Sequence, residues 1–121
     1  METNSRSLQK IDHRFPKSKT IKSKKDFLKI LNEGKTIDSN LLRVFYRDSV
    51  SPKFAFIVSK KVAKSSVKRN RMRRLMKESV RLSDNQNIKS DIIFIAKTDF
   101  SKSKLRDIQL EVERIFSEIA K

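Results

Sequence analysis

Apolar residues near the start of the chain recur at the spacing of a helix. Phe27, Ile30 and Leu31 lie about one turn apart, after Ser23, which can cap a helix, and before Gly34, which can end one. Gly34 is the only glycine of the chain, so we expect it to adopt a left-handed backbone conformation that other residues avoid. The pattern predicts a short first helix that ends at Gly34.

Three later stretches have the patterns of strands. The segment from Leu41 to Arg47 has the alternation of a strand. One face carries Leu42, Val44 and Tyr46, and the other carries Phe45 between two arginines. This phenylalanine is either a stacking surface for nucleobases or an edge aromatic covered by a helix. Residues 54–58 and 92–96 are apolar throughout, a pattern typical of central strands that are covered on both faces.

The stretch from Lys68 to Glu78 combines a helical pattern with dense positive charge. It holds six cationic side chains and one carboxylate in eleven residues. We expect the helix to begin near Ser65 or Ser66 and to rest on the sheet by an apolar stripe. The stripe consists of Met72, Leu75, Met76 and Val80. The other side is cationic, and the first turn is expected to project past the core and to favour phosphate.

A last helix is predicted near the C-terminus. Ser101 or Ser103 is the expected cap, and the charges of the helix are mixed, so we interpret it as structural. Its inner stripe consists of Leu105, Ile108, Val112, Ile115, Phe116 and Ile119.

The net charge of +16 on 121 residues is unevenly distributed. Residues 1–25 contribute +6 and residues 59–81 contribute +9. The length predicts one domain. Residues 1–19 are polar and basic and have no sustained periodicity, so we interpret them as a flexible basic arm. We interpret residues 20–121 as a single RNA-binding α+β domain. Such self-repelling charge favours a polyanionic partner, because phosphates that neutralise Lys and Arg release counterions.

Composition excludes several other classes of protein. The chain has no cysteine, so it has no disulfide, no thiolate zinc site and no cysteine nucleophile. Its longest apolar runs have five residues, so we expect a cytoplasmic protein with no membrane partner. No catalytic or phosphate-cradling motif is present, and the carboxylates do not converge. We therefore expect no catalytic residue, no metal or cofactor site in the protein and no small-molecule substrate. Phe45, which lies between Arg43 and Arg47 on the predicted strand, favours RNA over DNA as the polyanionic partner.

The pattern R-N-R-x-R-R-L-x-K-E at residues 69–78 closely resembles the signature of the bacterial ribonuclease P protein component. Further similar segments are Ile21-Lys22 with Asp26-Phe27, residues 56–61 and residues 91–96, so the resemblance covers about residues 17–120. It implies an α+β fold of order αβββαβα, with a mixed sheet packed by helices and a short extra strand near Thr36–Ser39. It also implies a left-handed crossover, against the usual right-handed preference.

The resemblance further implies a function. The protein would assist a catalytic RNA that removes the 5′ leader of precursor tRNA, with Mg²⁺ at the RNA-based active site, and would be inactive alone. The implied contacts to the RNA subunit are Lys60, Lys61, Lys64, Lys68, Arg69, Asn70, Arg71, Arg73, Arg74 and Lys77. The implied leader-binding cleft consists of Phe27, Leu31, Arg43, Phe45 and Arg47. Leu31 replaces a residue that is commonly aromatic in the family, which would weaken stacking there. The alternative is a ribosomal or RNA-chaperone-type protein with no role in cleavage.

Overall fold

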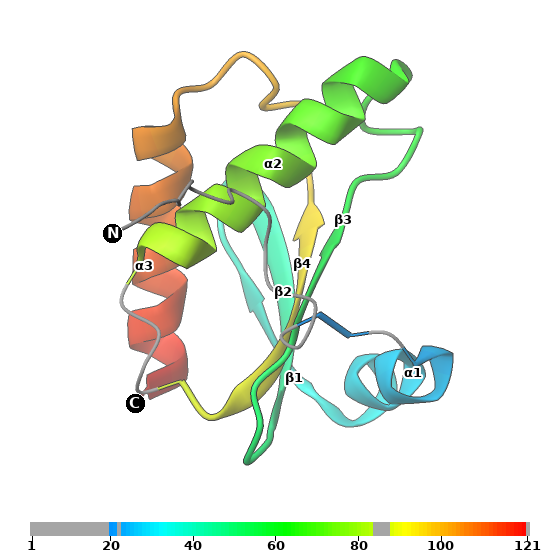
Figure 1. The fold of residues 1–121 in the computed structure, drawn as a ribbon, viewed down its shortest axis with the longest axis vertical. Helices are drawn as coiled ribbons and strands as arrows, with labels where there is room; N and C mark the ends of the chain where they lie inside the picture. The colour runs from blue at the N-terminus through cyan, green and yellow to red at the C-terminus, as the bar shows by residue number, and fades with distance from the viewer. Residues whose placement is uncertain (1–19, 22, 84–87, 121) are drawn as a thin grey trace, which may run out of the picture.

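The computed structural model describes residues 20–21, 23–83 and 88–120. Three helices and four strands follow one another in the expected αβββαβα order (Figure 1). They are α1 (Lys24–Glu33), β1 (Lys35–Asp38), β2 (Leu42–Asp48), β3 (Phe54–Ile57), α2 (Ser66–Leu82), β4 (Ser90–Ala96) and α3 (Leu105–Ala120). The short strand that only the resemblance implied is present as β1. The expected arm at residues 1–19 lies outside the described residues.

The sheet is mixed, with the strand order β1-β2-β4-β3. The β1–β2 and β2–β4 pairs are antiparallel, and the β3–β4 pair is parallel. The prediction of a central strand at residues 92–96 is confirmed by β4, but the same prediction for residues 54–58 is wrong because β3 lies at the end of the strand order. An apolar run therefore does not distinguish an inner strand from a short strand at the edge of the sheet. Thr20 and Ile21 lie beside the start of β3, where the Ile21 N–H donates to the Phe54 carbonyl at 2.9 Å.

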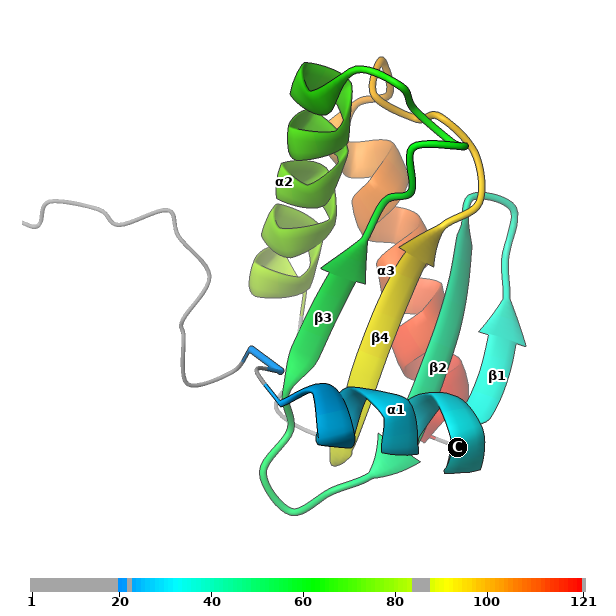
Figure 2. The same ribbon diagram turned by 90° about the vertical axis from the view of Figure 1, so that its right-hand side faces the viewer.

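The connection from β3 through α2 to β4 is left-handed. In Figure 2 both strands point upward, β4 lies to the right of β3, and α2 lies behind the sheet. A chain that rises in front, returns behind and steps to the right makes a left-handed turn, whereas nearly all such crossovers are right-handed. The implied handedness is therefore present in the structure.

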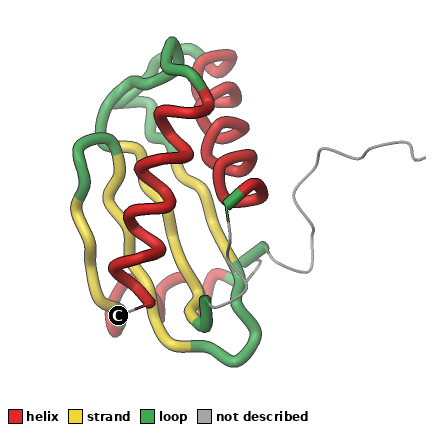
Figure 3. The backbone as a smooth tube through the Cα atoms, turned by 90° about the vertical axis from the view of Figure 1, so that its left-hand side faces the viewer, coloured by secondary structure: helices red, strands yellow, loops and turns green. Residues whose placement is uncertain are grey.

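The two faces of the sheet are covered differently. Helices α2 and α3 lie over one face (Figure 3), and α1 crosses one end of the other (Figure 2). The predicted stripe of α2 is confirmed, because Met72, Leu75, Met76 and Val80 are buried in the main core. Ile30 of α1 is buried on the opposite face, together with Ile93 of β4. This arrangement anchors α2 firmly and leaves part of the α1 face without a covering helix.

Gly34 joins α1 to β1 in an extended conformation, with φ −78° and ψ 166°. The prediction of a left-handed glycine is therefore wrong. A Cβ atom added at this position would lie 2.4 Å from the carbonyl oxygen of Ile30 and 2.6 Å from that of Tyr46. Glycine is required here because the end of α1 approaches the backbone of β2 too closely for any side chain.

The predicted caps of the first two helices are confirmed. The hydroxyl of Ser23 accepts from the Asp26 N–H, and that of Ser65 accepts from the Lys68 N–H, each at 3.4 Å. The predicted cap at Ser101 or Ser103 is wrong, because α3 begins only at Leu105. Residues 99–103 instead form a local turn, in which the Ser103 N–H donates to the Phe100 carbonyl at 2.9 Å.

Candidate nucleic-acid interfaces

The first candidate surface is the outer side of α2 with the loop that precedes it, here called the α2 surface. All its predicted members lie within the continuous segment 60–77, and each is exposed except Arg69 and Arg73, which are half-buried. The α2 surface consists of Lys60, Lys61, Lys64, Lys68, Arg69, Asn70, Arg71, Arg73, Arg74 and Lys77. The buried stripe on the other side of α2 anchors the helix, which carries the members from Lys68 to Lys77.

Three arginines of the α2 surface bind neutral acceptors. Arg69 Nη1 donates to the carbonyls of Ala63 at 2.9 Å and Lys64 at 2.7 Å. Arg71 Nε donates to the Ser101 carbonyl, and Arg73 Nη2 to the side-chain oxygen of Asn70. Neutral acceptors fix a guanidinium without cancelling its charge, so the positive field of this surface is preserved.

Near its C-terminal end α2 has a different arrangement. Arg81 Nη2 pairs with the carboxylate of Glu78, and this hydrogen bond raises the pKa of Arg81. It is the only ion pair of α2 among the described residues. The uncompensated cations of the helix therefore lie toward its N-terminal end.

The loop from β4 to α3 adds cations that the sequence analysis missed. Arg71 fixes this loop through the Ser101 carbonyl, and Lys102 and Lys104 are exposed. Hydrogen bonds from Ser101 hold the pKa of Asp99 below its usual value, with smaller contributions from the charges of Lys68 and Lys102. The contact between Arg71 and Ser101 places this loop beside α2. The Ser-Lys-Ser-Lys run at residues 101–104 carries this signal, but its serines also predict a helix cap.

The second candidate surface, here called the sheet surface, lies on the α1 face of the sheet. It consists of Phe27, Leu31, Arg43, Phe45 and Arg47. Phe27 and Leu31 are half-buried on the same side of α1 as the buried Ile30. Phe45 lies opposite Ile93 in the β2–β4 register and is also half-buried. The structure thus brings the predicted aromatic and apolar residues to one face, beside the part that α1 leaves uncovered (Figure 2).

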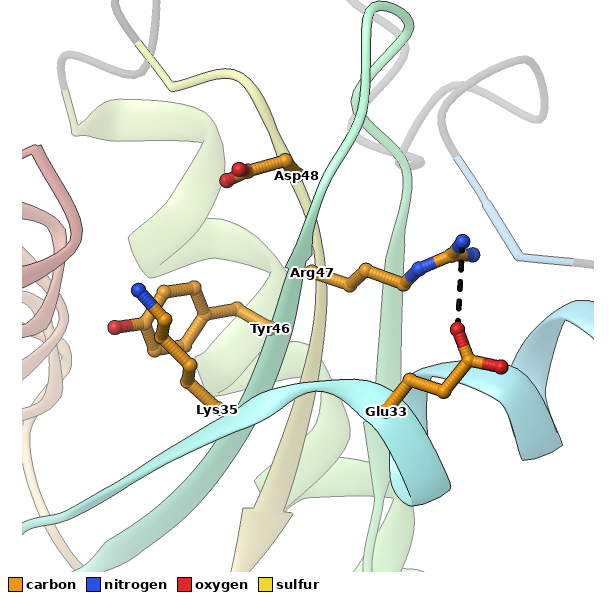
Figure 4. A pocket seen from close by; sticks show the side chains of 5 residues that line it. All are labelled: Glu33, Lys35, Tyr46, Arg47 and Asp48. Atoms are coloured by element: carbon orange, nitrogen blue, oxygen red, sulfur yellow. Dashed lines mark ion pairs between the residues drawn. The ribbon is translucent and has the colours of Figure 1, made fainter.

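Both arginines of the sheet surface are paired with carboxylates. Arg43 Nε lies 2.8 Å from Asp38 Oδ1, and Lys97 Nζ lies 3.7 Å from the same atom. Arg47 Nη2 lies 3.5 Å from Glu33 Oε1 (Figure 4). The hydrogen bond from Arg43 holds the pKa of the Asp38 carboxyl below its usual value. Sequence reasoning did not find these partners, because β1, which carries Asp38, has no apolar alternation.

A pocket of about 310 Å³ lies where α1, β1 and β2 meet (Figure 4). Its lining carries charges of both signs and includes the Arg47–Glu33 pair. The lining residues are Glu33, Lys35, Tyr46, Arg47 and Asp48. No three His, Asp or Glu side chains in the described ranges are grouped to hold a metal ion. No helix in these ranges is long and apolar enough to span a membrane.

Comparison with known proteins gives one consistent family. A family model described as ribonuclease P matches residues 15–120. The ribonuclease P protein component of Clostridioides difficile is 33% identical over 105 residues, which are 84% of this chain and 91% of that protein. The component of Fusobacterium nucleatum is 36% identical over 104 residues, which are 80% of this chain and 93% of that protein.

Solved structures show the same fold. The RNase P protein of Thermotoga maritima has a TM-score of 0.72 at 20% identity, with 83% of this chain and 96% of that chain covered. A mutant RNase P protein of Staphylococcus aureus with defective mRNA degradation activity has a TM-score of 0.74 at 24% identity, with 84% and 88% covered.

Proposed function

The chain belongs to the ribonuclease P protein family, and on that premise we propose that it binds the catalytic RNA of ribonuclease P and the 5′ leader of precursor tRNA. It is a protein component of a nuclease that processes tRNA. In the proposed division of labour the RNA subunit carries the hydrolytic chemistry with Mg²⁺, and the protein holds and orients the RNA. The protein alone is then inactive.

The observation that carries this proposal is the uncompensated charge of the α2 surface. Arg69, Arg71 and Arg73 are fixed by neutral oxygens, so their charges remain available to phosphate. Each phosphate that docks here displaces counterions and gains affinity at low salt. The exposed Lys102 and Lys104 extend the same surface onto the β4–α3 loop. A structured RNA, which presents many phosphates on a fixed surface, matches this arrangement.

The sheet surface suits a different partner, the single-stranded leader. Phe45 and Phe27 are half-buried and can present a ring face to unstacked bases, while Leu31 offers apolar contact with weaker stacking. Mature tRNA has no leader, so contacts on this surface favour the precursor over the product. The two surfaces together give the protein one partner that is always bound and one that is exchanged in each turnover.

Reconstitution with the RNA subunit of the same organism tests the proposal. The full-length protein should leave precursor tRNA intact by itself, and should lower the Mg²⁺ concentration at which that RNA cleaves the precursor. An unchanged Mg²⁺ requirement would overturn the proposed role and favour a ribosomal or RNA-chaperone function. Cleavage by RNA-free protein would contradict the division of labour between the two subunits.

A further inference from the structure

The sheet surface carries its own negative counter-charges. Arg43 and Arg47 flank Phe45 along β2, and each is paired with a carboxylate of a neighbouring element. Asp38 comes from β1 and Glu33 from the last turn of α1. The chain has only 14 acidic residues against 30 basic ones, so it is notable that both flanking arginines are neutralised. The arginines fixed on the α2 surface, by contrast, bind neutral oxygens.

Neither carboxylate is favoured by its local structure. Glu33 lies near the C-terminal end of α1, where the helix dipole disfavours negative charge. Asp38 ends a strand, and aspartate is depleted in strands. The Asp38 and Arg43 side chains are each 50% exposed, so their pairing contributes little to stability. A role in ligand binding accounts for these positions better than a role in folding.

We propose that Asp38 and Glu33 compete with RNA phosphates for Arg43 and Arg47, and so keep the hold on single-stranded RNA weak. This inference rests on the proposed function, because it assigns an affinity-limiting role to residues beside the leader surface. Carboxylate and phosphate oxygens accept from the same guanidinium donors, so a phosphate that takes the Nε–H of Arg43, which Asp38 Oδ1 holds at 2.8 Å, displaces that carboxylate. The displaced carboxylate keeps a partner in Lys97, whose Nζ is also held by the Ser39 carbonyl at 3.0 Å. Binding is therefore an exchange of anions on Arg43.

The exchange has a measurable signature in salt dependence. An arginine that already carries a carboxylate has fewer counterions to release, so its contact with phosphate adds little to the salt slope. Removing the carboxylate should strengthen binding and also steepen its dependence on salt. A purely structural role for Asp38 or Glu33 would change neither quantity in this direction.

The test compares Asp38→Asn and Glu33→Gln with Glu113→Gln on α3, which changes the net charge equally on the opposite side of the sheet. The probes are an unstructured RNA oligonucleotide with the full-length protein, and precursor or mature tRNA with the reconstituted holoenzyme. Each sheet-surface variant should bind the oligonucleotide and the precursor about two- to five-fold more tightly. Its salt slope should steepen by up to about one, and affinity for mature tRNA should not change.

Two further variants separate competition from positioning. Asp38→Glu should restore the wild-type affinity, and Asp38→Asn should give no gain when Arg43 is replaced by Gln. Unchanged or weaker binding by Asp38→Asn, in protein whose thermal unfolding is normal, overturns the inference. Tighter oligonucleotide binding without any stimulation of the RNA subunit would overturn the proposed function and leave the competition intact. Wild-type protein that binds no oligonucleotide at low salt would overturn both the proposed function and the proposed competition.

Discussion

The α2 surface and the sheet surface both present arginines, but they hold them in opposite ways. On the α2 surface, backbone carbonyls and the Asn70 amide fix the side chains and leave their charge intact. On the sheet surface, Asp38 and Glu33 pair with the side chains and offset their charge. The first arrangement keeps positive charge available at long range. In the second, under the proposed competition, the charge becomes available only when a ligand displaces a carboxylate.

This difference means that a count of cations does not give the charge that is available to a ligand. Arg43 and Arg74 are both exposed arginines, yet only Arg43 has a carboxylate partner within the described ranges. A permanent RNA partner gains from uncompensated charge, whereas a leader that must leave after each cleavage gains from a weaker hold. The type of hydrogen-bond acceptor, more than the number of arginines, separates the two uses.

Removing the aromatic ring of the sheet surface should give the largest effect. Phe45→Ala should weaken binding of leader-bearing precursor to the holoenzyme by about 1 to 3 kcal/mol per unstacked base. Mature tRNA should bind as before, because it lacks the stacked segment. Equilibrium binding of both RNAs at fixed salt measures this. Leu28→Ala removes an exposed apolar side chain of α1 and is the control. Equal losses on both RNAs would remove Phe45 from the leader path.

Charge removal on the α2 surface should have an effect near the middle of that range. Arg74→Gln with Lys77→Gln should lower the slope of log affinity against log salt by about two, and should weaken binding to the RNA subunit about 30-fold at 0.15 M salt. These residues are preferable to Arg69 and Arg71, which also hold loop carbonyls. A matched variant, Lys89→Gln with Arg114→Gln, removes two exposed cations that belong to neither surface. Identical slopes for the two double variants would show that the α2 cations only face solvent.

The smallest effect concerns the Arg43–Asp38 pair. Arg43→Gln should raise the pKa of Asp38 toward its usual value, because the hydrogen bond from Arg43 is the main cause that lowers it. A lowered pKa stabilises the fold above the usual aspartate range, and this contribution is lost as pH falls through the lowered value. Carboxyl titration by NMR measures the shift. Asp99 is the internal control, since Ser101 lowers its pKa. An unaltered Asp38 titration would show that the pair does not persist in solution.

Sequence patterns predicted the elements whose signal is local. The four-residue stripe of α2 is buried as its period indicated, and the alternation of β2 placed Phe45 and its arginines on one face. The position of β3 at the end of the sheet and the handedness of the crossover depend on long-range pairing, which an apolar run does not encode. Gly34 was correctly singled out, but its reason is a close approach to Tyr46 of β2 and not a torsion angle.

The cations of both candidate surfaces could be identified from the sequence, but their partners could not. Asp38 lies on β1, a strand of exposed and half-buried residues with no recognisable period. The contact of Arg71 with Ser101 joins residues 30 positions apart. Such contacts decide whether a charge is available, so the electrostatic difference between the surfaces emerges only from the fold.

The strand order has a consequence for synthesis on the ribosome. β4 is the last strand to be made, yet it lies between β2 and β3. A nascent chain that ends before residue 90 can form only the β1–β2 hairpin, which is marginally stable by itself, and β3 has no partner strand. The basic helix then emerges with its apolar stripe uncovered. A stalled chain of that length should therefore be cationic, aggregation-prone and readily degraded by proteases, and should not persist as a partly folded domain.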